Sequence, residues 1–134
     1  MKVFLDTNVI LDLILRRSGW QDIAKILQAA SDDTSIYLEM SILSVANIAY
    51  ILRKQPRNII IGIIRDISRK INVLDLSSSS IYSLERIDSP DMEDCFQIHS
   101  AESVWCDVII TNNTHHFKGY TEIPVMTPKE FIEN

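Results

Sequence analysis

The chain has 134 residues, of which 46% are hydrophobic, and it carries a formal net charge of −5 at pH 7. This length suits one domain with a proper core and leaves no room for a second, so we expect a single domain over residues 1–134. The sequence opens without a basic and apolar signal segment, and it contains no apolar run of membrane-spanning length. We therefore expect a cytoplasmic protein with no membrane partner.

The first stretch, KVFLDTNVILDLIL over residues 2–15, predicts a short buried strand, a polar turn and an apolar helix from about residue 9. Asp6 stands where the strand over residues 3–5 ends. Open α/β sheets bind ligands where strands lead into helices, because helix N-termini present free N–H groups. Asp6 is therefore a candidate site residue, although a carboxylate at this position also commonly caps the following helix.

The rest of the chain alternates between strand and helix patterns. Further strands are predicted over residues 36–40, 71–76, 108–111 and 125–126. Helices are predicted over residues 23–30, 42–53, 58–69, 77–85 and 90–105, and from residue 128 to the end. This alternation with short connections implies an α/β fold with a parallel sheet of four to five strands and helices on both faces.

Three helix starts carry recognisable signals. Ser41 is a plausible cap for the helix after the second strand. Ser89 followed by Pro90 predicts the start of the helix that reaches about residue 105. Thr127 and Glu130 have the spacing of a capping box, so the chain should close with a short helix.

Two of these helices carry polar side chains on faces that should be apolar. In the helix after the second strand, Ser44 and Asn47 lie one turn apart. A helix this apolar should be buried. The Asn47 amide should then be hydrogen-bonded to a partner or face a polar cavity. In the helix before the fourth strand, Asp94 shares a stripe with Ile98, and Asp91 lies one turn earlier. Acids near a helix N-terminus complement its dipole, but that explains the inward Asp94 poorly.

A polar turn, TNNTHHF, follows the fourth strand from Thr111 onward. Asparagine-rich turns are common, because asparagine tolerates positive φ and caps helices. The position of the turn is more informative than its composition, because Asp6 and Asn113 both follow strands at the carboxyl end of one sheet.

Basic residues are concentrated in one segment of this acidic chain. Six of the thirteen lie within residues 53–70, namely Arg53, Lys54, Arg57, Arg65, Arg69 and Lys70. The last third of the chain is acidic. A basic segment facing an acidic site suits a metal-dependent nuclease, which grips phosphates with one surface and holds cations with the other. A solvated helix face is the plain alternative.

Five segments together resemble a known family. FLDTNVILDLIL, SILSVANIAYIL, DMEDCFQIHSA, IITNNTHHF and IPVMTPKEFI follow the order and spacing of PIN domains, which include the toxins of VapC-like toxin–antitoxin modules. The resemblance covers residues 3–132 and implies a PIN-like three-layer sandwich. The family's four acidic positions fall on Asp6, Asn47, Asp94 and Asn113, so that two match as acids and two are amides.

The resemblance also assigns roles to residues of this chain. It places Asp6 and Asp94 as ligands of Mg²⁺ or Mn²⁺, and it makes Asp91 a further carboxylate. Neighbouring or phosphate-contacting groups would be Thr7, Asn8, Ser44, Thr111 and His116. The predicted RNA contacts are Arg53, Lys54, Arg57, Arg65 and Arg69.

The activity implied by the resemblance is metal-dependent hydrolysis of RNA, with a 5′-phosphate and a 3′-hydroxyl as products. Similar toxins pair as homodimers, and an antitoxin blocks them; here it would insert an arginine or lysine near Asp6 and Asp94.

The two amides each remove a negative charge, so we expect weak metal affinity and low or manganese-favoured activity. Two other functions stay open. One is a PIN fold that binds RNA or protein without catalysis. The other is an α/β phosphate enzyme with Asp6 as nucleophile, although such enzymes need a second acid where Asn8 stands.

Overall fold

A five-stranded parallel sheet forms the centre of the computed structural model, which describes residues 1–134. The strands are β1 (Lys2–Leu5), β2 (Tyr37–Ser41), β3 (Asn72–Leu74), β4 (Val108–Ile110) and β5 (Val125–Met126). Their order is β3-β2-β1-β4-β5, and every neighbouring pair is parallel. All the strands therefore end at one edge, and the order reverses between β1 and β4, where open α/β sheets bind ligands.

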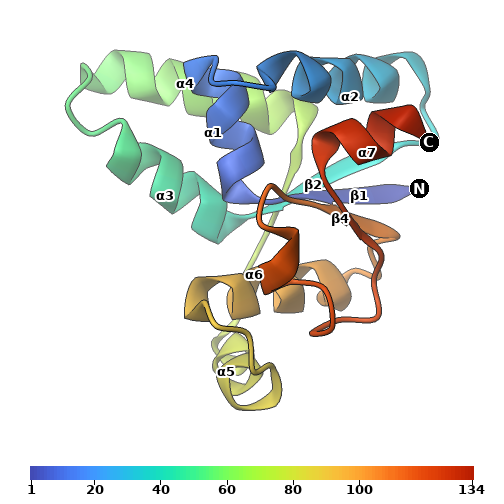
Figure 1. The fold of residues 1–134 in the computed structure, drawn as a ribbon. Coiled ribbons are helices and arrows are strands. Elements are labelled where there is room, and N and C mark those ends of the chain that lie inside the picture. The colour runs from blue at the N-terminus through green and yellow to red at the C-terminus, as the bar shows by residue number, and fades with distance from the viewer.

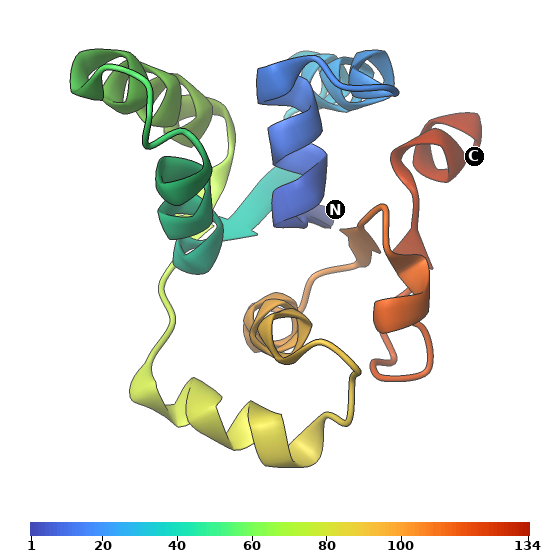
Figure 2. The ribbon, with the colours of Figure 1, turned by 60° about the vertical axis from the view of Figure 1, so that its left-hand side comes forward.

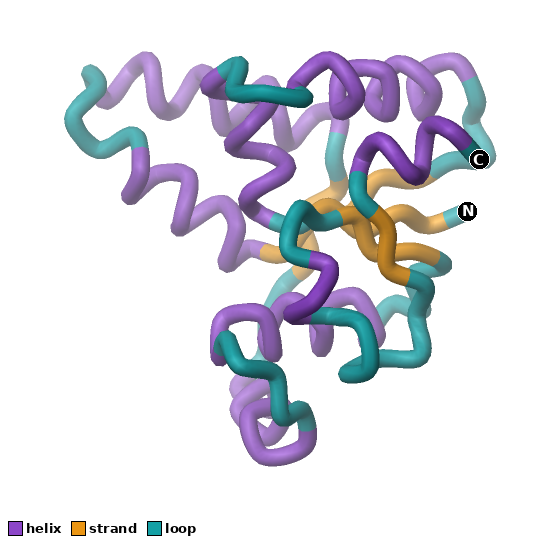
Figure 3. Tube along the Cα trace, in the orientation of Figure 1, coloured by secondary structure: helices purple, strands orange, loops and turns teal.

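Helices cover both faces of this sheet, as the alternating pattern predicts. They are α1 (Thr7–Leu15), α2 (Trp20–Asp32), α3 (Ile42–Ile51), α4 (Arg57–Lys70), α5 (Ser83–Arg86), α6 (Met92–Ser103) and α7 (Pro128–Glu133). In Figure 1, α1, α2 and α4 lie above the sheet, and α6 with α5 lies below it. Figure 3 shows the strands gathered in the middle of this three-layer arrangement. The expected α/β sandwich is confirmed.

The alternating side chains of β1 supply both halves of the core. Val3 and Leu5 pack in the larger cluster, under α1, α2 and α4, whereas Phe4 packs in the cluster that contains Ile98 of α6. Because β1 is buried on both faces, its end is held firmly from both sides. The residue that follows it, Asp6, is therefore positioned by the whole core.

The start of α6 differs from its prediction. The Asp91 side chain accepts hydrogen bonds from the Glu93 and Asp94 N–H groups, so the helix begins at Met92 and not at the Ser-Pro pair. Ser89 instead donates to the carbonyl oxygen of His116 at 2.9 Å. A carboxylate that satisfies two free N–H groups is the stronger cap. The shift places Asp94 in the first turn of the helix.

The other helix signals have mixed outcomes. The capping box at Thr127 is confirmed, and Ser41 caps α3 by accepting from Ser44 N–H. The segment after β3 is a short 3₁₀ turn (Ser78–Tyr82) followed by α5.

Burial of α3 was predicted from its composition, and this prediction is wrong for one face and for the last turn. Ile42 and Tyr50 on that face are 43% and 63% exposed, and Ile51 in the last turn is 50% exposed. The helix packs on α4 and the sheet with its other side, and Figure 2 shows α3 and α4 as a hairpin standing to one side of α1. None of the helices is both long enough and apolar enough to cross a membrane.

Candidate functional site

Asp6 lies at the end of β1 and is only 4% exposed. Its Oδ1 atom accepts hydrogen bonds from Thr7 N at 2.8 Å and from Gln97 Nε2 at 3.0 Å, and its Oδ2 accepts from Thr111 Oγ1 at 2.8 Å. Burial raises the pKa of Asp6, while the hydrogen bonds from Thr111, Gln97 and Thr7 act in the opposite direction. The carboxylate therefore caps α1 and is also held by polar side chains at the sheet edge.

The polar residues predicted around Asp6 do meet there. Thr7 and Ser44 lie with their hydroxyl oxygens 2.7 Å apart, and Gln97 Nε2 is 3.0 Å from each of those oxygens. The sequence reasoning did not select Gln97. The signal was its position three residues after Asp94, because residues 94, 97, 98 and 101 follow the spacing of one buried helix stripe.

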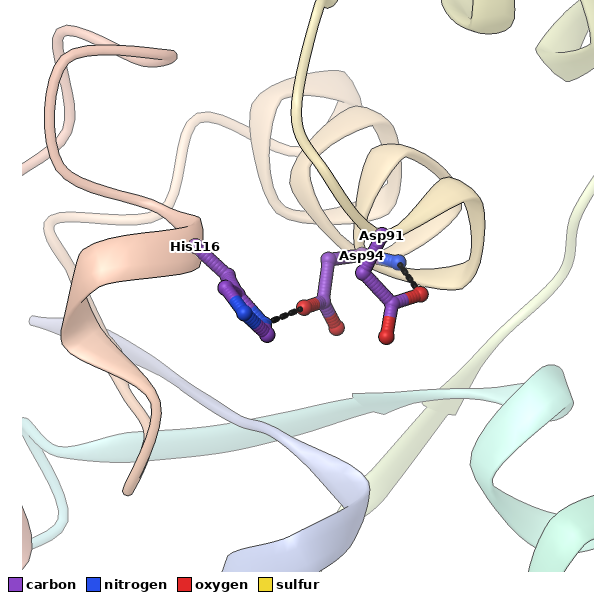
Figure 4. A group of neighbouring side chains, drawn as sticks. All are labelled: Asp91, Asp94 and His116. Carbon is purple, nitrogen blue, oxygen red and sulfur yellow. Dashed lines mark hydrogen bonds and ion pairs between the residues drawn. The ribbon is translucent and has the colours of Figure 1, made fainter.

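The first turn of α6 brings a second group together. Asp94 Oδ2 lies 3.0 Å from His116 Nδ1, and the Asp94 side chain is 9% exposed. Ligand atoms of Asp91, Asp94 and His116 all lie within 4.8 Å of one another. Figure 4 shows these three side chains converging from the α6 turn and from the 3₁₀ turn Thr114–His116.

The electrostatics of this group reflect its crowding. Burial, followed by the negative charges of Asp6 and Asp91, raises the pKa of Asp94 to about 7, against a smaller opposing effect from His116. The charge of Asp6 therefore affects the pKa of Asp94, although no hydrogen bond joins the two carboxylates. The strand-end residue and the α6 turn form one site.

A fourth carboxylate enters this site from Glu93. Asn47 Nδ2 donates a hydrogen bond to Glu93 Oε1, which ties α3 to α6. Burial, then the charges of Asp91 and Asp6, raises the pKa of Glu93. The sequence analysis did not select Glu93 as a site residue. Asn47 stands at the α3 position where the PIN resemblance implies an acid. In the structure its amide orients the Glu93 carboxylate of α6. The site thus holds more negative charge than the sequence predicted.

No arginine or lysine of the chain neutralises these acids. The three ion pairs that basic side chains other than histidine form are Arg17–Asp12, Arg69–Asp66 and Arg86–Glu102, all outside the site. Clustered carboxylates with raised pKa values and no cationic partner are relieved by binding a cation. Carboxylate oxygens with one imidazole form a donor set that suits Mg²⁺ or, better, Mn²⁺.

The compact ligand group differs from the predicted pair of ligands. Asp94 belongs to it, together with Asp91 and His116, but Asp6 lies outside it. All the hydrogen-bonding contacts of the Asp6 oxygens are with donors from the protein.

Two predicted residues make other contacts. The Asn113 side chain forms no hydrogen bond; its backbone N–H donates to Thr111 Oγ1, and its carbonyl accepts from His116 N–H. Its contact with Thr111, which holds Asp6, is therefore made by the backbone. Asn8 accepts from Asn112 N–H at 3.3 Å, so that it joins α1 to the turn after β4.

The predicted RNA-contacting residues are all exposed, and they lie along the α3–α4 hairpin. They are Arg53, Lys54, Arg57, Arg65 and Arg69. The Arg53 guanidinium lies 4.1 Å from the centre of the Tyr50 ring, and Arg69 lies 3.9 Å from Asp66. None of the five forms an ion pair with an acid of the site, so the hairpin and the acids are separate charged surfaces.

Solved structures share this fold over nearly the whole chain. A chain of the VapBC2 complex from Rickettsia felis, solved bound to a DNA fragment from its promoter, has a TM-score of 0.74 at 14% identity, covering 93% of this chain and 97% of that one. A chain of VapBC-1 from nontypeable Haemophilus influenzae has a TM-score of 0.72 at 21% identity, covering 96% and 99%. A toxin–antitoxin complex from Klebsiella pneumoniae gives 0.67 at 20% identity, covering 94% and 97%.

No curated protein matches the sequence. A family model does, and it is described as a PIN domain and matches residues 2–115. That match spans β1 to the turn after β4 and includes every acid of the site described above. The chain therefore belongs to the PIN domain family.

Proposed function

We propose that the chain is a Mg²⁺- or Mn²⁺-dependent ribonuclease that hydrolyses RNA phosphodiester bonds. The observation that carries this proposal is the cluster of Asp91, Asp94 and His116, which lies beside Asp6 and Glu93 and has no lysine or arginine partner. Membership of the PIN domain family supports it. Phosphodiester hydrolysis needs a cation where the phosphate charge arrives, and the chain supplies no cation there of its own.

Each residue of the site has a distinct part in this proposal. Asp91, Asp94 and His116 would hold the cation, whereas Asp6 and Glu93 would add negative charge around it without joining the compact group. The three ligand residues would hold a Mg²⁺ or Mn²⁺ ion, which would supply a Lewis acid for a phosphate oxygen and for an attacking water. Asp6 is poorly placed to act as a nucleophile, because three donors already hold its oxygens.

The experiment is single-turnover cleavage of a structured RNA pool at about 5 to 10 mM Mn²⁺ or Mg²⁺, an excess for a weak site. Wild type should cleave only with metal, and Asp94→Asn should reduce the rate by at least about 100-fold, the scale seen when groups that act on the reacting centre are lost. Asp32→Asn is the matched control, because it also removes one negative charge, but at the C-terminal end of α2 and outside the site.

Each outcome of that experiment decides between the two functions. Cleavage lost in Asp94→Asn and kept in Asp32→Asn supports the ribonuclease. No cleavage by folded wild-type protein with either metal would leave a PIN fold that binds without catalysis, and RNA binding by wild type would then be measured directly.

An antitoxin partner is a further part of this proposal. The similar structures come from complexes described as VapBC or toxin–antitoxin complexes. A partner segment carrying arginine or lysine would complement the uncompensated acids near Asp6 and Asp94. The product of a neighbouring gene should therefore bind wild type more tightly than the Asp6→Ala, Asp94→Ala double variant; equal affinity would contradict this mode of binding.

A homodimer is the oligomeric state that we propose. Ile42 and Tyr50, which are exposed on one side of α3, offer an apolar surface that a second copy could bury. Sedimentation of wild type and Tyr50→Lys should show a dimer that the substitution dissociates; an unchanged monomer in both would contradict it.

A further inference from the structure

Gln97 connects more elements of the site than any of its acids. It is wholly buried in α6. Its Nε2 atom lies 3.0 Å from Asp6 Oδ1, Thr7 Oγ1 and Ser44 Oγ, and its Oε1 accepts from Ser41 Oγ at 2.6 Å. This one side chain therefore joins α6 to the ends of β1 and β2 and to the starts of α1 and α3.

The surrounding groups fix which way the Gln97 amide points. Ser41 Oγ accepts from Ser44 N–H, so its own hydrogen is free to be donated to Gln97 Oε1. The Asp6 carboxylate only accepts hydrogen bonds. A reversed amide would set its oxygen against that carboxylate, which has no hydrogen to donate. The NH₂ group must therefore face Asp6.

An amide is well suited to this position because it is neutral. A buried lysine or arginine could also donate to Asp6, but its charge would cancel the negative charge that attracts a cation to the neighbouring acids. Gln97 orients the Asp6 carboxylate and leaves its charge intact. That charge is felt by Asp94 and Glu93, which belong to the same site.

We propose that Gln97 is the positioning residue of the site, which holds the Asp6 carboxylate in the orientation that supports cation binding by Asp91, Asp94 and His116. This inference rests on the proposed function, because it assumes that the acids bind a divalent cation. Gln97 touches neither substrate nor cation. It acts through Asp6, with Thr111 holding the second carboxylate oxygen.

The test is the affinity of the full chain for Mn²⁺ alone, measured by calorimetry without RNA. Gln97→Met keeps the length of the side chain and removes its donors, so Asp6 loses one of three hydrogen bonds. We expect a rise in the Mn²⁺ dissociation constant of up to about 10-fold, the low end of the range found when outer partners of metal ligands are removed, because Asp6 acts beside the ligands and not as one of them. Cleavage should fall at low Mn²⁺ and recover at saturating Mn²⁺, which a general loss of structure would not produce.

Ser100→Ala is the matched control on the same helix. Ser100 is also buried in α6, but its Oγ has no hydrogen-bond partner, so removing it should leave Mn²⁺ affinity unchanged. If Gln97→Met does not fold, Gln97→Asn decides the question. Its shorter side chain cannot bridge Ser41 and Asp6 together, and we expect the same loss of affinity.

The outcomes separate this inference from the proposed function. If Asp94→Asn loses Mn²⁺ affinity and a folded Gln97 variant keeps it, the positioning role is overturned and the metal site stands. If wild type binds no Mn²⁺, or Asp94→Asn binds it as wild type does, the proposed metal site itself fails, and the role of Gln97 fails with it.

Discussion

Asp6 and Asp94 are both buried aspartates of one site, but they differ in the number of hydrogen-bond donors around their carboxylates. Asp6 accepts hydrogen bonds from three separate donors, and the Asp94 carboxylate accepts only from His116. Burial raises the pKa of both. Three donors oppose that effect at Asp6, and His116 alone opposes it at Asp94, whose pKa is about 7.

This difference shows how one sheet edge can be both stable and reactive. A carboxylate surrounded by donors is part of the folded structure, because its partners would be left unsatisfied without it. A carboxylate with one titratable partner gains most from an added cation. We therefore assign Asp6 to the framework of the site and Asp94 to the binding of ligand.

The largest expected effect that separates the two residues is on stability. Asp6→Ala leaves the Thr7 N–H, one Gln97 hydrogen and the Thr111 hydroxyl without an acceptor, and it should lower the free energy of unfolding by about 3 kcal/mol. Asp94→Ala should change it by less than about 1 kcal/mol, or raise it, at pH 8 without metal. Urea unfolding of both variants measures this. If both variants lose the same free energy of unfolding, the separate roles of Asp6 and Asp94 are contradicted.

The next effect is a dependence of stability on pH. Because the pKa of Asp94 is about 7 in the folded chain and 3.8 is its ordinary value, the folded state binds more protons between these values. The contribution of Asp94 to stability without metal should therefore be full below about pH 4 and be lost as the pH rises to about 7, by about 2 kcal/mol after allowance for solvent screening. Asp94→Asn should flatten the fall, and Mn²⁺ should stabilise wild type more at pH 8 than at pH 5. An identical pH profile in Asp94→Asn would contradict the assignment.

A smaller effect is expected at His116. His116→Ala removes the one donor to the Asp94 carboxylate and a possible ligand, so cleavage at limiting Mn²⁺ should fall 10- to 100-fold. His115→Ala is the matched control, because the neighbouring ring makes no hydrogen bond to an acid of the site and is exposed. Similar losses in both variants would indicate a disturbed turn and not a role for His116.

The sequence predicted the fold well, because its buried strands are short, apolar and bounded by helix signals. It also selected Asp6, Thr7, Ser44 and Thr111, which lie in one hydrogen-bonded group in the structure. These residues lie at strand ends or interrupt apolar helix faces, and such positions can be recognised from the order of residues alone.

The rest of the site depends on contacts between distant segments. Gln97 meets Ser44 across 53 residues, and Glu93 meets Asn47 across 46. No local pattern shows that an amide on α3 would face an acid on α6. Asn113 stays a prediction, because the structure gives hydrogen bonds to its backbone and none to its side chain.

The acids of the site repel a polyanion until a cation is bound, so the hairpin of α3 and α4 should supply the contacts that bind the RNA phosphates. Lys54 and Arg57 are the best probes, because both are exposed and neither forms an ion pair. Replacing both with alanine should reduce the salt dependence of RNA binding by about one to two units of slope. The control replaces Arg17 and Arg86, which are already paired with Asp12 and Glu102 and should change the slope less. If the slope is unchanged in the hairpin variant, this basic surface is an ordinary solvated face. Asp6 and Asp94 would then belong to a cation site that has no RNA-binding surface beside it.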